Sequence, residues 1–179
     1  MKYELIEKQV IFEGRKVRLE VHHLRNEDTG LRHHREVVIH GGAVCVLPLK
    51  SDGSVVLIRQ RRYSVNATLV EVPAGTLEKN EPPMNCAGRE LLEETGYLAG
   101  RLVPIGSFYT SPGILTEKMY AFAAYDLEKR ESALEEGEDI ELLEVPYEQA
   151  IQMIVDGEIT DGKTVATLLW YDRFHRASK

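Results

Sequence analysis

The sequence predicts a mixed α/β protein that carries a small antiparallel β-sheet ahead of its main domain. Extended segments fill the first forty residues, and turn residues such as Glu13-Gly14 and Thr29-Gly30 separate them into hairpins. From Gly41 onward the pattern changes to apolar runs, which are typical of strands buried on both faces. Later segments have the spacing of amphipathic helices. We therefore expect an N-terminal β-region at 1–40 and a core domain at 41–179.

The N-terminal strands are expected at roughly 3–12, 15–25 and 31–40. In the middle one, the apolar residues Val17, Leu19 and Val21 alternate with polar neighbours, as in a strand with one covered face. A three-stranded sheet of this size is only marginally stable by itself. We therefore expect it to pack against the main domain or against a second copy of the chain.

The core domain begins with two apolar strands. Residues 43–49 form a continuous apolar run, and a turn at 51–54 leads into a second strand at 55–58. The second strand ends in Arg59-Gln60-Arg61-Arg62. Three arginines so close together in an acidic chain are either a solvated strand end or a clamp for phosphates, which the guanidinium fork binds well. The residues alone leave both interpretations open.

A short strand is expected next, at 69–75. Within it, Pro73 and Gly75 fix a turn and let the backbone come close to a ligand. The remaining expected elements are strands at 102–109 and 118–126, the loop Ser111-Pro112-Gly113, and helices at 147–156 and 161–176.

The segment between Pro82 and Gly96 is the most informative helix. Prolines suit its first turn, because their missing N–H groups would lack partners there, and Gly96 suits the left-handed position after its end. Glu90, Glu93 and Glu94 share one helical face. Neighbouring carboxylates repel one another unless cations lie among them, and their hard oxygens suit Mg²⁺ or Mn²⁺. The alternative is a surface helix with a solvated acidic face.

Composition and charge exclude several classes of protein. A net charge of −7 argues against a general nucleic-acid binder, which needs clustered Lys and Arg. No apolar run approaches the ~20 residues that span a bilayer, and the first residues lack the apolar core of a signal peptide. We therefore expect a cytoplasmic protein without nucleic-acid or membrane partners. Cys45 and Cys86 lack metal-site spacing and are expected to be reduced packing residues.

The stretch from Gly75 to Tyr97 resembles the signature of the Nudix hydrolases, which cleave nucleoside diphosphates linked to another moiety. Every fixed position of that signature is filled, by Gly75, Glu81, Arg89, Glu90, Leu91, Glu93, Glu94, Gly96 and Tyr97. The resemblance implies an α/β/α sandwich with a mixed central sheet, in addition to the small N-terminal antiparallel β-sheet. It also implies Mg²⁺ as the cofactor, with Mn²⁺ as the alternative, at about two or three ions per site.

Features outside the signature resemble the ADP-ribose pyrophosphatase branch of this family. They are Arg35-Glu36-Val37, Gln60-Arg61-Arg62, Ser111-Pro112-Gly113 and Glu117. A proline about fifteen residues after the signature marks that branch, and Pro112 occupies this position. The resemblance implies metal-dependent hydrolysis of ADP-ribose to AMP and ribose 5-phosphate.

The resemblance also assigns roles to individual residues. The implied metal ligands are the main-chain carbonyl of Ala74 and the carboxylates of Glu90, Glu94 and Glu138. Glu136 would be the general base, with Glu93 as the alternative and Glu135 one residue out of register. The implied substrate contacts are Arg35, Arg62, Thr76, Ser111, Pro112, Gly113 and Glu117. Relatives often hold the adenine with aromatic residues from the N-terminal sheet, and Phe12 is the candidate here.

Two other functions compete with this interpretation. One is hydrolysis of another nucleoside diphosphate sugar, such as GDP-mannose or ADP-glucose, or of a broad set. The other is a non-catalytic ADP-ribose sensor, which predicts a degraded signature, whereas all signature carboxylates are intact. The expected assembly is a homodimer, because the small sheet gains stability by packing across a two-fold axis and contributes to the partner's pocket in the resembled branch.

Overall fold

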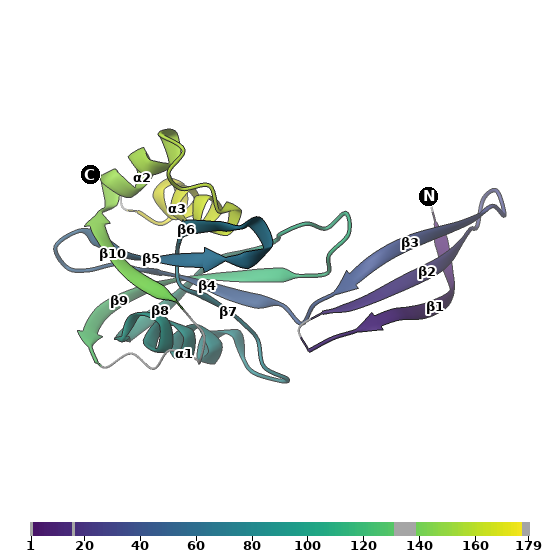
Figure 1. The fold of residues 1–179 in the computed structure, drawn as a ribbon, viewed down its shortest axis with the longest axis horizontal. Coiled ribbons are helices and arrows are strands. Elements are labelled where there is room, and N and C mark those ends of the chain that lie inside the picture. The colour runs from purple at the N-terminus through teal and green to yellow at the C-terminus, as the bar shows by residue number, and fades with distance from the viewer. Residues whose placement is uncertain (1, 16, 131–138, 177–179) are drawn as a thin grey trace. The chain divides into compact units, whose positions relative to one another are not determined.

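The computed structural model describes residues 2–15, 17–130 and 139–176. The chain divides into two compact units, which are shown in Figure 1 and are described one at a time. We call them the sheet unit, made of Met1–Gly42 and Tyr109–Lys118, and the core unit, made of Ala43–Phe108 and Met119–Lys179.

The sheet unit contains a three-stranded antiparallel sheet in the order β1-β2-β3. Its strands are β1 (Tyr3–Glu13), β2 (Arg18–Asn26) and β3 (Arg32–Ile39). The turn after β2 forms because the side chain of Asn26 accepts hydrogen bonds from the N–H groups of Asp28 and Thr29, at 2.9 Å each. Strand β1 is exposed along its whole length. This sheet therefore has few buried apolar contacts of its own.

A segment from the middle of the chain, residues 109–118, is also part of the sheet unit. The N–H of Val38 on β3 donates to the carbonyl of Ile114 at 2.8 Å, and the N–H of Thr116 donates back to the carbonyl of Val38 at 3.0 Å. The hydroxyl of Thr116 accepts a third bond, from the N–H of His40 at 2.9 Å. The predicted loop Ser111-Pro112-Gly113 is thus attached to the end of β3.

The core unit is built on two sheets. One is antiparallel in the order β10-β5-β6, and the other has the order β7-β4-β9-β8 with β4 and β9 parallel. The strands are β4 (Ala43–Pro48), β5 (Ser54–Arg62), β6 (Ala67–Glu71), β7 (Ala74–Thr76), β8 (Tyr97–Tyr109), β9 (Lys118–Lys129) and β10 (Ile140–Pro146). The helices are α1 (Pro83–Thr95), α2 (Tyr147–Val155) and α3 (Gly162–Phe174), and a short 3-10 turn covers Tyr63–Val65.

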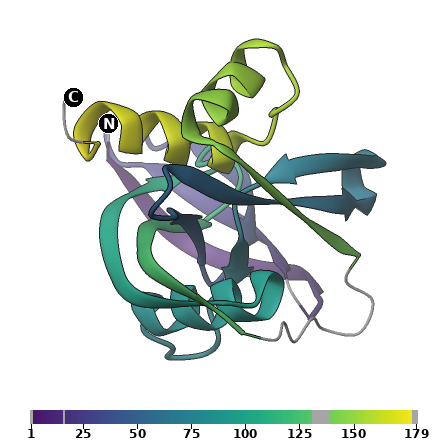
Figure 2. The ribbon, with the colours of Figure 1, turned by 90° about the vertical axis from the view of Figure 1, so that its left-hand side faces the viewer.

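The helices cover opposite sides of these sheets, with α1 on one side and α2 and α3 on the other (Figure 2). Along β4, Val44 and Val46 pack with Leu91 of α1, whereas Cys45 and Leu47 pack with the residues of the opposite side. Successive strand residues point to opposite faces, so a strand covered twice needs an unbroken apolar run. The predicted α/β/α sandwich with a mixed central sheet and a separate antiparallel sheet is confirmed.

Helix α1 begins and ends as the sequence predicts. Pro82 precedes its first residue, and Gly96 follows its last with a φ of 67° and an N–H that donates to the carbonyl of Leu92. Helix α3 begins at an Asp161 cap, whose carboxylate accepts the N–H of Thr164. None of the helices within the described ranges has both the length and the apolar character that crossing a membrane requires.

Two strand predictions differ from the structure. The single strand expected at 69–75 is two strands in different sheets, β6 and β7, because Pro73 has no N–H for a ladder and interrupts the pairing. The strand expected at 102–109 begins earlier, at Tyr97, since the left-handed Gly96 turns the chain directly from α1 into β8.

Candidate metal-binding and catalytic site

Two carboxylates of α1 meet the backbone of β7. The buried side chain of Glu94 accepts a hydrogen bond from the N–H of Ala74, with Oε2 at 2.9 Å. The carboxylate of Glu90 lies against Gly75 so closely that a Cβ on Gly75 would be 1.9 Å from the Cδ of Glu90. Only glycine permits this approach. One helical turn thus brings two acidic groups to the same short strand.

Arg89 holds three carboxylates of the signature around its guanidinium group. Its Nη1 lies 2.8 Å from Glu90 and donates to Glu93 at 2.9 Å, while Nε and Nη2 each donate to Glu81 at 3.1 Å. The hydrogen bonds from Arg89 lower the pKa of Glu81 to about 2. Arg89 therefore supplies part of the cationic charge that the crowded acidic face needs. Arg89 is a recognisable signature residue, but this role was not predicted from the sequence.

Cys86 lies under the same cluster and is a packing residue, as predicted. Its thiol is fully buried, at 3.4 Å from the Nη2 of Arg89. Burial raises the pKa of the thiol to about 12, with a further contribution from Glu81. A buried thiol that stays protonated at neutral pH is a poor nucleophile.

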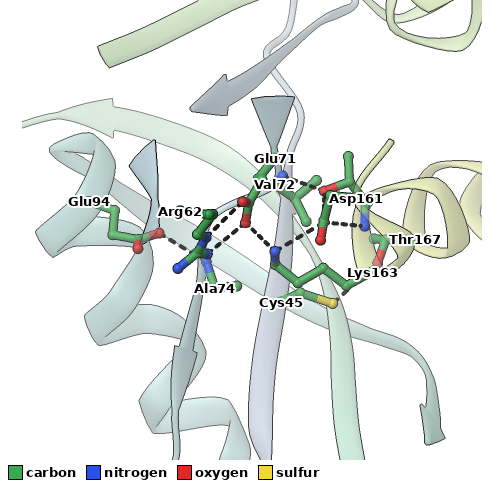
Figure 3. Close-up of polar contacts among 10 residues, drawn as sticks. Cys45, Arg62, Glu71, Val72, Ala74, Glu94, Asp161, Lys163 and Thr167 are labelled. Atoms are coloured by element: carbon green, nitrogen blue, oxygen red, sulfur yellow. Dashed lines mark hydrogen bonds and ion pairs between the residues drawn. The ribbon is translucent and has the colours of Figure 1, made fainter. Parts of the chain in front are cut away.

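The three arginines at the end of β5 have separate partners. Arg62 donates two hydrogen bonds to Glu71, from Nε at 2.8 Å and from Nη2 at 2.6 Å. Arg59 lies 3.5 Å from Glu141, and Arg61 donates to Asn66. The three arginines therefore do not act as a single phosphate clamp. Of the three, Arg62 is the one that lies near the acidic helix. Figure 3 shows Arg62 between Glu71 and the contact of Ala74 with Glu94.

Glu71 is the centre of a buried ionic network. Its side chain is 1% exposed, and it binds Lys163 of α3 in addition to Arg62. Lys163 also donates to Asp161 at 3.0 Å. This network of Glu71, Lys163 and Asp161 was not predicted from the sequence. The signal for Glu71 was a lone charge between the apolar residues Val70 and Val72.

The sheet unit holds another group of the predicted residues. The carboxylate of Glu117 accepts a hydrogen bond from the hydroxyl of Thr110 at 2.7 Å and lies 3.3 Å from Nδ1 of His40. Arg35 on β3 donates to the carbonyl of its neighbour His34 at 2.8 Å. Ser111, Pro112 and Gly113 are exposed. The contact between His40 and Glu117 was not predicted from the sequence.

The predicted site residues thus fall into three groups. In the core unit the structure brings together Ala74, Glu90, Glu94 and Arg62. Glu93 forms an ion pair with Arg89, and Thr76 is exposed at the end of β7. The sheet unit carries Arg35, Ser111, Pro112, Gly113 and Glu117, as well as the exposed Phe12. The predicted base Glu136 and the predicted ligand Glu138 lie outside the described residues.

The donor set near β7 fits a hard divalent cation. Glu90, Glu94 and the adjacent main chain offer oxygen atoms, which Mg²⁺ and Mn²⁺ prefer over nitrogen or sulfur. Among the described residues, no three acidic, histidine or cysteine side chains lie together in a group that could hold a metal ion. A complete site therefore needs a ligand beyond Glu90 and Glu94.

Comparison with known proteins gives consistent findings. A model of the NUDIX domain matches residues 39–168. The chain is 42% identical to an ADP-ribose pyrophosphatase of Bacillus subtilis, with 89% of this chain and 86% of that protein covered. It is 40% identical to a methanol dehydrogenase activator of Bacillus methanolicus, with 89% and 87% covered. It is 41% identical to a GDP-mannose pyrophosphatase of Shigella flexneri, with 84% of each covered.

A solved structure supports the fold alone. The crystal structure of an ADP compounds hydrolase superimposes with a TM-score of 0.84 at 20% identity, covering 96% of this chain and 93% of that one. The similarity spans nearly the whole of both chains, so it includes the N-terminal region as well as the core.

The close approach of Gly75 to Glu90 leads to a testable prediction. In Gly75→Ala, the new Cβ displaces the flexible end of Glu90, so we expect Mn²⁺ to bind about 10–100-fold more weakly, with a loss of stability below about 2 kcal/mol. Calorimetric Mn²⁺ titration and thermal unfolding measure the two effects.

The matched control for this variant is Gly88→Ala in the same signature. There the nearest atom to a new Cβ is Cδ1 of Leu102, at an ordinary 3.6 Å. Alanine within a helix should stabilise the protein by about 0.5–1 kcal/mol and leave Mn²⁺ binding unchanged. Wild-type Mn²⁺ affinity in Gly75→Ala would show that the position of Glu90 does not depend on Gly75.

Proposed function

Because the chain belongs to the Nudix family of hydrolases, we propose that it cleaves the diphosphate bond of ADP-ribose with water, giving AMP and ribose 5-phosphate. The observation that carries the proposal is the pair Glu90 and Glu94, held against β7 beside Arg62. The choice of ADP-ribose is supported by 42% identity to an ADP-ribose pyrophosphatase over 89% of the chain.

The cofactor belongs to the same proposal. Nudix hydrolases generally use a divalent metal, and we propose Mg²⁺, with Mn²⁺ as a substitute, at about two or three ions per site. Glu90, Glu94, the main-chain carbonyl of Ala74 and Glu138 would hold these ions. When bound, they neutralise the diphosphate and lower the pKa of coordinated water. This assignment explains why two carboxylates are directed at one short strand.

The remaining residues bind the substrate and move a proton. Glu136 takes a proton from the attacking water, a new P–O bond forms, and the bridging P–O bond breaks so that its oxygen leaves with one of the two products. Arg62 and Arg35 hold the non-reacting phosphate and the terminal ribose. The other proposed contacts are Thr76, Ser111, Pro112, Gly113 and Glu117.

The contacts of Glu93 bear on which residue is the base. Glu93 is paired with Arg89 at 2.9 Å, so its carboxylate is already engaged in a charge-assisted hydrogen bond within the helix. This pairing favours Glu136 over Glu93 as the general base.

The second candidate function is hydrolysis of another nucleoside diphosphate sugar. It is favoured by a GDP-mannose pyrophosphatase at 41% identity, which nearly equals the identity to the ADP-ribose pyrophosphatase. The reaction class would be the same, and only the group beyond the diphosphate would differ. ADP-glucose is a further candidate of this class.

We also propose that the protein is a cytoplasmic homodimer. The supporting observation is β1, an edge strand on which several apolar side chains are about half exposed, namely Leu5, Ile6, Val10, Ile11 and Phe12. An exposed apolar edge strand favours pairing with another chain. A second copy covering this strand would remove that apolar surface from water.

Product analysis tests the function directly. With Mg²⁺, wild-type protein should convert ADP-ribose to equal amounts of AMP and ribose 5-phosphate, and removal of the metal should abolish the reaction. Glu94→Gln should lower kcat/KM by about 100-fold or more, because it removes a charged metal ligand. Chromatography of the products measures both effects. Faster turnover of GDP-mannose than of ADP-ribose would favour the second candidate.

A comparison of two variants identifies the general base. At saturating Mg²⁺, Glu136→Gln should lower kcat by about 10²–10⁴-fold, whereas Glu93→Gln should lower it much less. Steady-state kinetics with ADP-ribose measures both values. Near-normal kcat in Glu136→Gln would exclude this residue as the base.

The assembly can be tested by sedimentation. Wild-type protein should sediment as a dimer, and Ile11→Lys on β1 should shift it toward the monomer because a charge would enter the apolar contact. Val155→Lys provides the control, because Val155 is 74% exposed on α2 in the core unit. An active wild-type monomer at assay concentrations would contradict the proposal.

A further inference from the structure

Lys163, on the first turn of α3, is a cation that the proposed reaction does not yet use. It lies far from the signature in sequence, yet its Nζ binds the carboxylate that also holds Arg62. Its side chain is only 11% exposed. A lysine is rarely this buried unless it is paired, and Glu71 and Asp161 are its partners.

Glu71 needs both of its cations. Burial by itself would raise the pKa of Glu71, but the hydrogen bonds from Arg62 and the charge of Lys163 outweigh burial, so the pKa is lowered. A buried carboxylate that loses one of two partners keeps an uncompensated charge, which is strongly destabilising. Removing Lys163 therefore changes the environment of the Arg62–Glu71 pair although it leaves both residues in place.

Lys163 is held in position by its own helix. Asp161 caps α3 by accepting the N–H of Thr164 at 3.0 Å, and the same carboxylate oxygen accepts from Lys163 at 3.0 Å. The hydroxyl of Thr164 then accepts the N–H of Val72 at 2.9 Å. Since Val72 directly follows Glu71, the first turn of α3 is attached to the strand end that presents Glu71.

The geometry of Arg62 shows what this support achieves. Its Nε and Nη2 are both used on Glu71, so two parallel hydrogen bonds fix the plane of the guanidinium group. Its side chain nevertheless remains 36% exposed. The pair Arg62–Glu71 is neutral by itself. Lys163 places a second cation on the carboxylate of Glu71, and Asp161 balances the added charge, so the four side chains form a neutral network.

We propose that Lys163 is a positioning residue: through Glu71 it holds the guanidinium group of Arg62 in the orientation that binds the diphosphate of the substrate. The part that concerns the substrate rests on the proposed function. The part that concerns Arg62 does not, and it is measured without substrate.

The orientation of Arg62 can be followed by NMR. In wild-type protein the Nε–H of Arg62, bonded to Glu71, should give a distinct resonance that exchanges slowly with water, assigned from its loss in Arg62→Met. In Lys163→Met, which keeps the apolar stem, this resonance should broaden or exchange at least about tenfold faster. Lys163→Arg should restore it. Lys163→Gln, with a neutral donor, replaces the methionine variant if that one does not fold.

The matched control is Arg176→Met. Arg176 follows the other end of α3 and also pairs with two carboxylates, those of Glu148 and Asp172. Its ion pairs are with Glu148 and Asp172 and not with Glu71. Its loss should therefore lower the thermal unfolding temperature while the resonance and exchange rate of the Arg62 Nε–H stay as in the wild type. An unchanged Arg62 resonance in Lys163→Met would overturn the proposal.

Kinetics tests the consequence for the substrate. Lys163→Met should raise the KM for ADP-ribose by about tenfold and change kcat by less than about twofold, because a misoriented Arg62 weakens binding of the non-reacting phosphate. In an Arg62→Met background, Lys163→Met should have no further effect on KM. Additive effects would show that Lys163 does not act through Arg62.

If wild-type protein fails to hydrolyse ADP-ribose, the proposed function is wrong while the NMR result still decides the role of Lys163.

Discussion

The contact between the acidic face of α1 and the backbone of β7 is the constraint on which the rest of the site depends. Glu94 binds the N–H of Ala74, and Glu90 occupies the space that any side chain at position 75 would need. Both contacts require α1 to begin and end in register with the strand that precedes it. Pro82 and Gly96 fix those two ends, so the residues that bound the helix determine where the carboxylates lie.

Much of this could be predicted from the sequence because the determining patterns are local. Turn residues and apolar periodicity give the strands of the sheet unit and the strands of the core that are buried on both faces. The acidic helix is recognisable because its spacing, its prolines and its terminal glycine occur within one short segment. The break between β6 and β7 was not predicted, because it depends on how Pro73 interrupts pairing in two different sheets.

The ionic partners could not be predicted, since they join residues distant in sequence. Glu71 appears in the sequence as an isolated charge in an apolar strand, and nothing in the sequence connects it with Lys163 on α3. The partners of the three arginines of β5 were also not predicted, because the sequence left open whether the run is a phosphate clamp or a solvated strand end. Successive side chains of a strand point to opposite faces, Arg59 lies opposite Glu141 in the pairing of β5 with β10, and Arg61 reaches Asn66 beyond the turn that follows β5.

The attachment of residues 109–118 to β3 means that the N-terminal sheet is not a removable appendage. Cutting the chain after Gly42 would take away Val38 and His40, the bonding partners of Ile114 and Thr116, and leave a loop of the core sequence without its support. Changes of loop and sheet are therefore expected to be coupled when such proteins diverge. A graft that replaces this loop must carry β3 with it, whereas the acidic helix and β7 can remain as they are.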